Sequence, residues 1–310
     1  MIGAAGEVMR ICSLLPSATE ILYALGLGES VVGVTHECDY PPEATRKPAL
    51  IRSRVDPQAA PAEIDRQVGE LVARGESIYG VDAELLESLS PDLIITQDLC
   101  HVCAASPEDL ATALARLARQ PRVLSLTPHS LADVWSDVKR VGEATATERC
   151  AEALAAKLSA RAAAIEAVVK SATTRPRVAC LEWLDPFYVA GHWVPEMVAA
   201  AGGEDAFGRA REASFRVSAE DIVRARPDVM IVMPCGYNIS RTIREFSLDS
   251  LPKSWKKLPA VQERKIFAVD ANSYFSRPGP RLAEGVELLA HLFHPELDPV
   301  VTAEEAFKQL

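Results

Sequence analysis

The sequence predicts an α/β fold of two Rossmann-like lobes with mainly parallel sheets, joined by a long connecting α-helix, with a ligand cleft between the lobes. Three observations predict it. Short apolar runs alternate with helical stretches, which is typical of parallel sheets covered by helices. The 310 residues exceed the usual span of one hydrophobic core. One helix–strand unit also occurs twice in the chain.

The N-terminal lobe is expected over residues 9–128. Its predicted strands are the apolar runs 11–15, 31–35, 93–96 and 122–126. Pro16 followed by Ser17-Ala-Thr-Glu20 predicts a helix with a capping box, ending near Gly26. Ser106-Pro107-Glu108 predicts another helix start, with proline at the first helical position.

A connecting helical segment is expected over residues 129–174. Between Ser130 and Thr174 there is no proline and a single glycine. Thr145-Ala-Thr-Glu148 reads as a capping box, and the alanine-rich helix after it should run to about Ser171. A helix of about 25 residues is about 37 Å long, which could connect two lobes. The alternative is an ordinary long surface helix.

The C-terminal lobe is expected over residues 175–298. Its predicted strands are 178–183, 229–233 and 266–270. A closing helix is predicted over 281–293, where His294-Pro295 ends it.

An internal repeat supports two similar lobes. Residues 81–95 and 217–231 align without gaps, so a single constant offset relates the two copies. They share Val, Ala, Glu, Pro, Asp and a final Ile. Each copy reads as a short capped helix, a Pro-Asp turn and a buried strand. The alternative is a chance similarity between two amphipathic helix–strand units.

Charge and hydrophobicity exclude some classes of binding partner and indicate where in the cell the protein is expected. The formal net charge of -10 would repel nucleic acid and anionic lipid surfaces. No apolar run approaches the roughly 20 residues of a membrane span. The N-terminus lacks the basic start and the apolar stretch of about 7–15 residues that mark a secretory signal. We therefore expect a cytoplasmic monomer, or a periplasmic or other extracytoplasmic protein if a signal has been removed.

Aromatic side chains gather where the predicted strands end. Ligands of parallel α/β lobes bind at the carboxyl ends of the strands. The candidate ligand-binding residues at these ends in the C-terminal lobe are Glu182, Trp183, Phe187, His192, Trp193, Tyr237, Tyr274 and Arg277. Aromatic plates beside a few polar donors suit a broad, apolar macrocycle. The alternative is that these rings pack in the core, which is the interpretation that we prefer for Phe275.

Thiols and imidazoles suggest a second kind of site. Cys100-His-Val-Cys103 is a CxxC motif after a predicted strand, and His36 and Cys38 follow another. Thiolate and imidazole suit zinc, iron or a similar metal, so these four residues are candidate metal ligands. A redox pair is one alternative, and buried cysteines that act as small hydrophobic residues are another. The odd total of seven cysteines favours reduced thiols.

Several stretches resemble a known family. SLLPSATEILYALGLGESVVGVTHECDYPPEA, AGHWVPEMVAAAGGEDAF and SYFSRPGPRLAEGVELLAHLFHP occur in the order found in the cobalamin- and iron-siderophore-type binding proteins of ABC transporters. These are class III periplasmic binding proteins with a helical backbone. The resemblance runs from about Arg10 to Pro295 and is greatest to the cobalamin-binding members.

The resemblance implies a ligand held between two lobes with little hinge motion. It points to Trp183, Phe187, Tyr274 and Arg277 as ligand contacts, followed by Tyr79. It also implies that one glutamate per lobe faces arginines of a membrane permease; these correspond to Glu84 and Glu220. The alternative is that both glutamates only complement the dipole at a helix N-terminus.

The leading hypothesis is a non-catalytic binding protein for cobalamin or a related corrinoid or metal chelate, with no required cofactor. Cys38, Cys100 or His192 is a candidate axial ligand for its cobalt. The runner-up is a cytosolic metal- or thiol-dependent enzyme that works through Cys38, Cys100 and Cys103. The chain contains neither GxGxxG nor GxxxxGK, so nucleotide binding has no support.

Overall fold

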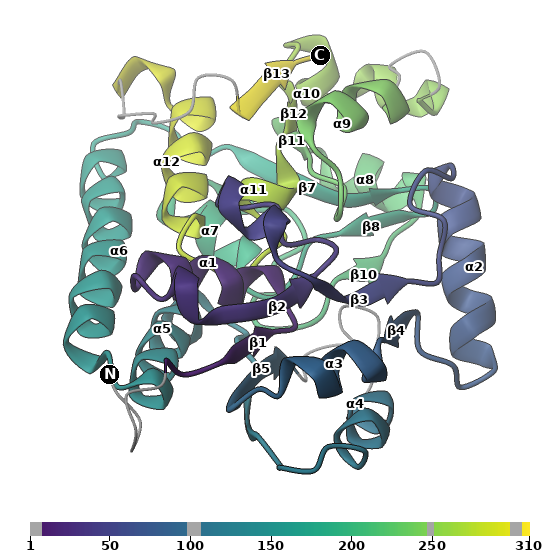
Figure 1. Ribbon diagram of the computed structural model, residues 1–310. Helices are drawn as coiled ribbons and strands as arrows, with labels where there is room; N and C mark the ends of the chain where they lie inside the picture. The colour runs from purple at the N-terminus through teal and green to yellow at the C-terminus, as the bar shows by residue number, and fades with distance from the viewer. Residues whose placement is uncertain (1–7, 98–106, 247–250, 298–305) are drawn as a thin grey trace. The chain divides into compact units, whose positions relative to one another are not determined.

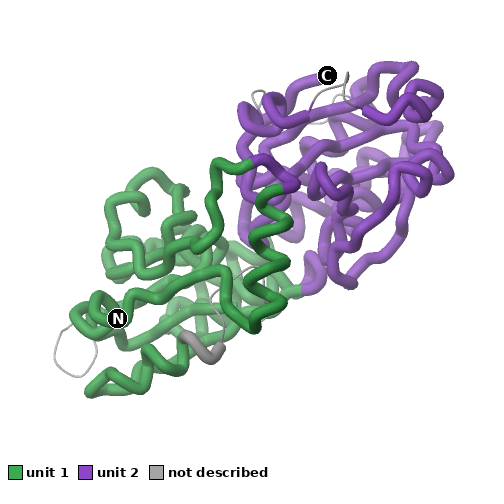
Figure 2. Tube along the Cα trace, turned by 90° about the vertical axis from the view of Figure 1, so that its right-hand side faces the viewer, with its two compact units in different colours: residues 1–59, 63–128, 133–156 green, residues 60–62, 129–132, 157–310 purple. Residues whose placement is uncertain are grey.

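The computed structural model describes residues 8–97, 107–246, 251–297 and 306–310 (Figure 1). The chain divides into two compact units, coloured separately in Figure 2. Unit 1 comprises Met1–Ala59, Glu63–Pro128 and Asp133–Ala156. Unit 2 comprises Ala60–Ala62, His129–Ala132 and Lys157–Leu310.

Unit 1 contains a six-stranded sheet in the order β4-β3-β2-β1-β5-β6. Its strands are β1 (Ile11–Ser13), β2 (Val31–Thr35), β3 (Ala49–Ser53), β4 (Tyr79–Val81), β5 (Leu93–Gln97) and β6 (Arg122–Leu126). All neighbours are parallel except β3 and β4. The helices of this half of the chain are α1 (Pro16–Ala24), α2 (Pro61–Ala73), α3 (Ala83–Leu89), α4 (Pro107–Leu114), α5 (Leu131–Thr145) and α6 (Glu148–Val169).

Unit 2 contains a second sheet in the order β10-β8-β7-β11-β12-β13, with β9 paired to β7. The strands are β7 (Arg177–Leu184), β8 (Phe187–Val189), β9 (Glu204–Asp205), β10 (Phe215–Arg216), β11 (Val229–Val232), β12 (Ile266–Val269) and β13 (Phe307–Gln309). The central strands β7, β11 and β12 are parallel. The helices are α7 (Val194–Ala200), α8 (Ala219–Ala225), α9 (Ile239–Glu245), α10 (Pro259–Gln262), α11 (Ala271–Tyr274) and α12 (Leu282–Phe293).

Both sheets are mostly parallel and belong to α/β units, which confirms the predicted fold class. The central strands β11 and β12 are buried along their whole length. A parallel strand with helices on both faces has no solvent side, which is why these runs are apolar without alternation. The closing helix α12 is apolar almost all round and contacts α7 beside the unit 2 sheet (Figure 1).

The sequence missed six short strands, mainly at the margins of the two sheets: β3, β4, β8, β9, β10 and β13. These strands have two to five residues, and several carry exposed polar side chains such as Arg52 and Glu204. Strands of this length are too short to contain a long apolar run. Their positions depend on the neighbouring strand rather than on their own composition.

Two expected helix starts are wrong in detail. Helix α1 begins at Pro16 with Leu15 as its N-cap and without a side-chain cap in the described structure, so the expected capping box of Ser17 and Glu20 is not formed there. Thr145 ends α5 instead of capping α6, and its hydroxyl donates to the carbonyl of Val141 at 2.8 Å. The connecting segment is therefore two helices in sequence. The division between the units falls within the second, after Ala156.

The internal repeat is confirmed in three dimensions. Helix α3 and the start of β5 are related to helix α8 and the start of β11 by the same constant offset as the two sequence copies. Both helices end in a left-handed residue, Ser90 in one copy and Arg226 in the other.

The aspartates of the two Pro-Asp turns make equivalent hydrogen bonds. Asp92 Oδ2 accepts from the backbone N–H of Arg10 at 2.9 Å, and Asp228 Oδ2 accepts from that of Arg177 at 2.9 Å. The guanidinium Nε of Arg10 donates to the carbonyl of Leu89, and that of Arg177 donates to the carbonyl of Ala225, the equivalent position of the second copy. Each turn is thus tied to the start of the first strand of its own unit.

Candidate ligand-binding site

The carboxyl end of β7 carries the largest partly exposed ring of the candidate set. The indole of Trp183 lies 5.4 Å from the ring of Tyr237 in an edge-on arrangement. Its Nε1–H donates to the carbonyl of Pro61 at 3.3 Å. Trp183 is half-buried, whereas Tyr237 is only 2% exposed. Tyr237 therefore supports the indole from beneath, and Trp183 presents part of its ring to solvent.

Two of the tyrosine rings have an arginine guanidinium group nearby. Arg241 lies over the ring of Tyr237 at 3.8 Å and donates to its hydroxyl at 3.1 Å. Arg281 lies 5.9 Å from the ring centroid of Tyr274 at the C-terminus of α11. Arg277, three residues later than Tyr274, is only 9% exposed. Aromatic faces next to cationic donors are suited to a ligand with an apolar body and a polar rim.

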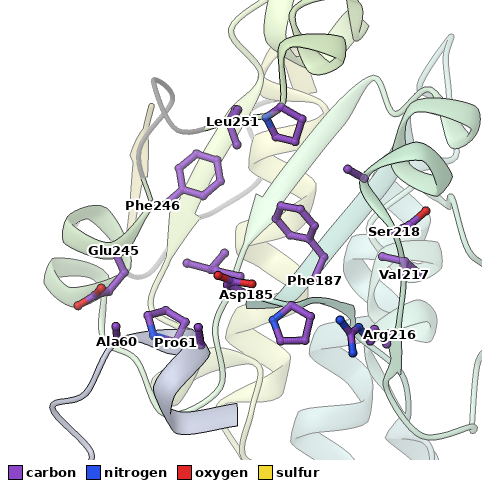
Figure 3. A pocket seen from close by; sticks show the side chains of 15 residues that line it. Ala60, Pro61, Asp185, Phe187, Arg216, Val217, Ser218, Glu245, Phe246 and Leu251 are labelled. Atoms are coloured by element: carbon purple, nitrogen blue, oxygen red, sulfur yellow. The ribbon is translucent and has the colours of Figure 1, made fainter. Parts of the chain in front are cut away.

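A hollow of about 830 Å³ opens within unit 2 beside the turn from β7 to β8. Figure 3 shows the rings of Phe187 and Phe246 among its walls. The residues that line it are Ala60, Pro61, Ala62, Leu184, Asp185, Pro186, Phe187, Arg216, Val217, Ser218, Ala219, Glu245, Phe246, Leu251 and Pro252. Its volume is within the range of small-molecule sites, about 300–1,000 Å³.

The charged groups of this hollow are few and mixed. Asp185 and Glu245 contribute carboxylates, Arg216 contributes a guanidinium, and most of the other walls are apolar (Figure 3). Phe187 is anchored from behind, since its ring lies 4.9 Å from that of the fully buried Trp255. An apolar cavity with a few fixed polar groups orients a ligand while it buries the ligand's faces.

Glu182 and Ser214 join β7 to the region before β10. The Ser214 hydroxyl donates to the Glu182 carboxylate, and the same hydroxyl accepts from the backbone N–H of Gly191 at 3.3 Å. Glu182 therefore holds the turn that carries His192. Its part in ligand contact stays a prediction.

His192 and Trp193 occupy a tight turn before α7. His192 has a positive φ of 52°, and its ring stacks on Trp193 with centroids 5.5 Å apart. Trp193 is 5% exposed, and its indole N–H donates to the carbonyl of Phe275 at 2.8 Å. Burial, with the neighbouring His129, lowers the pKa of His192 below its ordinary value. Trp193 and Phe275 pack in the core, as expected for Phe275.

In unit 1, Tyr79 and His36 come together at one end of the sheet. Their ring centroids are 6.1 Å apart. His36 Nδ1 lies 2.9 Å from the carbonyl of Ile51, which leaves Nε2 as the ring nitrogen directed elsewhere. The Cys38 thiol is buried and lies 3.1 Å from the Thr19 hydroxyl.

The metal cluster of His36, Cys38, Cys100 and Cys103 stays a prediction, because Cys100 and Cys103 lie outside the described residues. Within the described ranges, no group of three or more His, Cys, Asp or Glu side chains is arranged to hold a metal ion. In the same part of the chain, no helix is both long and apolar enough to cross a membrane.

The two glutamates of the repeat are exposed in the first turns of α3 and α8. Other side chains cap these helices: Asp82 accepts from the N–H of Leu85, and Ser218 and Asp221 form a capping box. Glu84 and Glu220 are therefore not needed as caps.

Sequence reasoning placed the rings at the strand ends but missed part of the hollow. Arg216, Phe246 and Leu251 were not expected to meet Phe187. The run Asp185-Pro186 after a strand was the available signal, because it marks a turn at the ligand-binding end of a sheet. Nothing local in the sequence around Phe246 indicates a binding wall.

Matches to known proteins cover nearly the whole chain. A family model described as periplasmic binding protein matches residues 11–273. The uncharacterized ABC transporter substrate-binding lipoprotein YvrC of Bacillus subtilis (strain 168) is 26% identical over 298 residues, which cover 94% of this chain and 81% of that protein. The vitamin B12-binding protein of Vibrio vulnificus (strain CMCP6) is 23% identical over 291 residues, which cover 93% of this chain and 91% of that protein.

Solved structures give the same fold. The periplasmic heme-binding protein RhuT from Roseiflexus sp. RS-1, in its apo form, superimposes with a TM-score of 0.72 at 29% identity, covering 94% of this chain and 100% of that chain. The periplasmic vitamin B12-binding protein BtuF of Vibrio cholerae has a TM-score of 0.67 at 22% identity, covering 94% and 98%. The second likeness is one of fold alone.

Proposed function

The chain belongs to the periplasmic binding protein family, and on this basis we propose that it binds a corrinoid, with cobalamin as the first ligand to test, and delivers it to an ABC importer. It does so without chemical turnover and works outside the cytoplasm. Its ligand is a flat, metal-centred ring whose faces are apolar and whose rim is polar.

The observation that carries the proposal is the aromatic surface at the strand ends of unit 2. Trp183 is half-exposed, Tyr237 holds it from beneath, and Phe187 lines the adjacent hollow. Trp183 and Phe187 keep part of their apolar ring surface exposed, and a ligand can cover that part. A macrocycle offers broad apolar faces for such rings.

The charges favour an amide-rimmed ring over one that carries carboxylates. Asp185 and Glu245 line the hollow together with Arg216, and Glu245 is paired with Arg244 at 3.4 Å. A ligand carboxylate placed near Asp185 would be repelled, because like charges a few ångströms apart raise the energy of the bound state. The carboxamides of a corrin can donate to both acids and accept from the guanidinium. Full-length similarity extends both to a vitamin B12-binding protein and to a heme-binding protein, so the choice between the two rings rests on these charges.

Titration calorimetry with cyanocobalamin tests the proposal directly. We expect one site per chain with a dissociation constant at or below about 1 μM, which corresponds to about 8 kcal/mol of binding free energy. Heme, a ring with two carboxylates, serves as the comparison and should bind more weakly. Absence of binding heat with cobalamin, or tighter binding of heme, would reject the corrinoid assignment.

The same role requires contact with a permease, and we assign this to Glu84 and Glu220. Their exposure and the presence of separate caps on both helices support it. Reversing both charges (E84K/E220K) should abolish capture of the importer in a pull-down, while cobalamin affinity changes less than about twofold. Undiminished capture by the double variant would exclude these residues as docking points.

A further inference from the structure

Two histidines of unit 2 lie side by side, and neither lines the hollow described above. The ring centroids of His129 and His192 are 6.0 Å apart, with an angle of 42° between the planes. We propose that this pair binds a borderline transition-metal ion of the Zn²⁺, Co²⁺ or Ni²⁺ class, with water completing the coordination. His192 is also a candidate axial ligand for cobalt, but it does not line the hollow, so this proposal does not depend on the corrinoid proposal.

The spacing of the rings fits one shared ion. A metal lies about 2.0–2.1 Å from an imidazole nitrogen, so two rings that share it have centroids roughly 5–6.5 Å apart, depending on the angle at the metal. The observed 6.0 Å is within this range. Borderline divalent ions of the first transition row prefer imidazole ligands of this kind.

His192 carries a buried ring nitrogen that could serve as a ligand. Among the described residues, its Nδ1 finds no hydrogen-bond partner. Leaving such a polar atom unsatisfied costs about 1–3 kcal/mol, and coordination of a cation would remove that cost.

The backbone holds the His192 ring in place before an ion arrives. Its N–H donates to the carbonyl of Glu212 at 2.6 Å, and its own carbonyl accepts from Arg211 at 2.8 Å. Stacking on Trp193 fixes the ring plane. A non-glycine residue at positive φ, held from both sides, is a feature that often accompanies function.

A hydrogen bond also joins the two segments that carry these histidines. Glu196, on α7 shortly after His192, accepts through Oε2 from the backbone N–H of Leu131, shortly after His129, at 2.9 Å.

Cobalt titration distinguishes this site from any thiol site. The parent for the test is the full chain with Cys100→Ser and Cys103→Ser, which removes the CxxC thiols. Co²⁺ bound by nitrogen shows visible d–d bands without the near-ultraviolet charge-transfer band of thiolate ligation. We expect the parent to show the nitrogen spectrum, with His129→Ala and His192→Asn weakening binding at least about tenfold each, or about 1.4 kcal/mol.

The variants are chosen to keep the fold. His129 is exposed, and asparagine tolerates the positive φ of His192. His291→Gln is the control, because the Nδ1 of His291 also finds no partner within the described chain, but its ring packs against Phe307. Equal cobalt affinity in the parent and both variants, or an equal loss in the control, would overturn the proposal. Cobalamin titration of the same proteins reports separately on the ligand site.

Discussion

Replacing Trp183 by alanine should weaken cobalamin binding by about 100-fold, or about 2.7 kcal/mol, which is the range of a binding hot spot. The indole is half-exposed at the end of β7, adjoins Tyr237 and is held by its hydrogen bond to Pro61. It is therefore pre-oriented, so little side-chain entropy is lost when a ligand covers it. Calorimetric titration of the purified variant measures the effect.

Two controls separate ligand contact from loss of structure. Trp183→Phe keeps an apolar ring and should lose no more than about tenfold, since most of the buried area remains. Urea unfolding of both variants checks that the fold is intact. If folded W183A binds cobalamin as tightly as the wild type, Trp183 is a structural residue and the aromatic surface lies elsewhere.

Replacing Glu287 by alanine should lower the free energy of unfolding by about 3 kcal/mol, because it leaves a partly buried guanidinium without its main partner. Arg161 on α6 donates to both carboxylate oxygens of Glu287 on α12, at 2.8 Å each. Glu287 is only 8% exposed. The pair fastens the part of α6 that belongs to unit 2 to the closing helix of that unit. The midpoint of urea unfolding measures the change.

An exposed ion pair in the same unit is the matched control. Glu204 lies 3.1 Å from Arg177, with 61% of its side chain exposed. Glu204→Ala should change the unfolding free energy by less than about 1 kcal/mol, because solvent screens the pair. Equal effects of the two substitutions would mean that burial does not set the strength of the Arg161–Glu287 pair.

The repeat explains why so much of the fold is predictable. Two copies of one helix–turn–strand unit carry the same turn aspartate, and in both copies this aspartate accepts from a backbone N–H at the start of the first strand of its unit. The helix caps of each copy are local contacts, so the sequence alone indicated both copies. The bond of the turn aspartate is not local, because it reaches a residue 82 positions away in one copy and 51 in the other, and only the structure shows it.

The site was only half predictable. The rings at the carboxyl ends of β7 and β11 follow from the topology of parallel strands, so Trp183 and Tyr237 could be placed near each other. The walls at Phe246 and Leu251 come from segments that are distant in the chain, and no periodicity links them to Phe187. The contact between His129 and His192 was unpredictable for the same reason, because one residue precedes α5 and the other precedes α7.

The α/β class and the repeat could be read from local periodicity, capping and turn chemistry, and the same patterns indicated where candidate aromatic residues lie. Which rings are exposed and which are buried, where the hollow lies and which two histidines meet became known only from the folded chain. Burial and long-range contacts depend on how several elements pack together, and the residues of one element do not specify its neighbours.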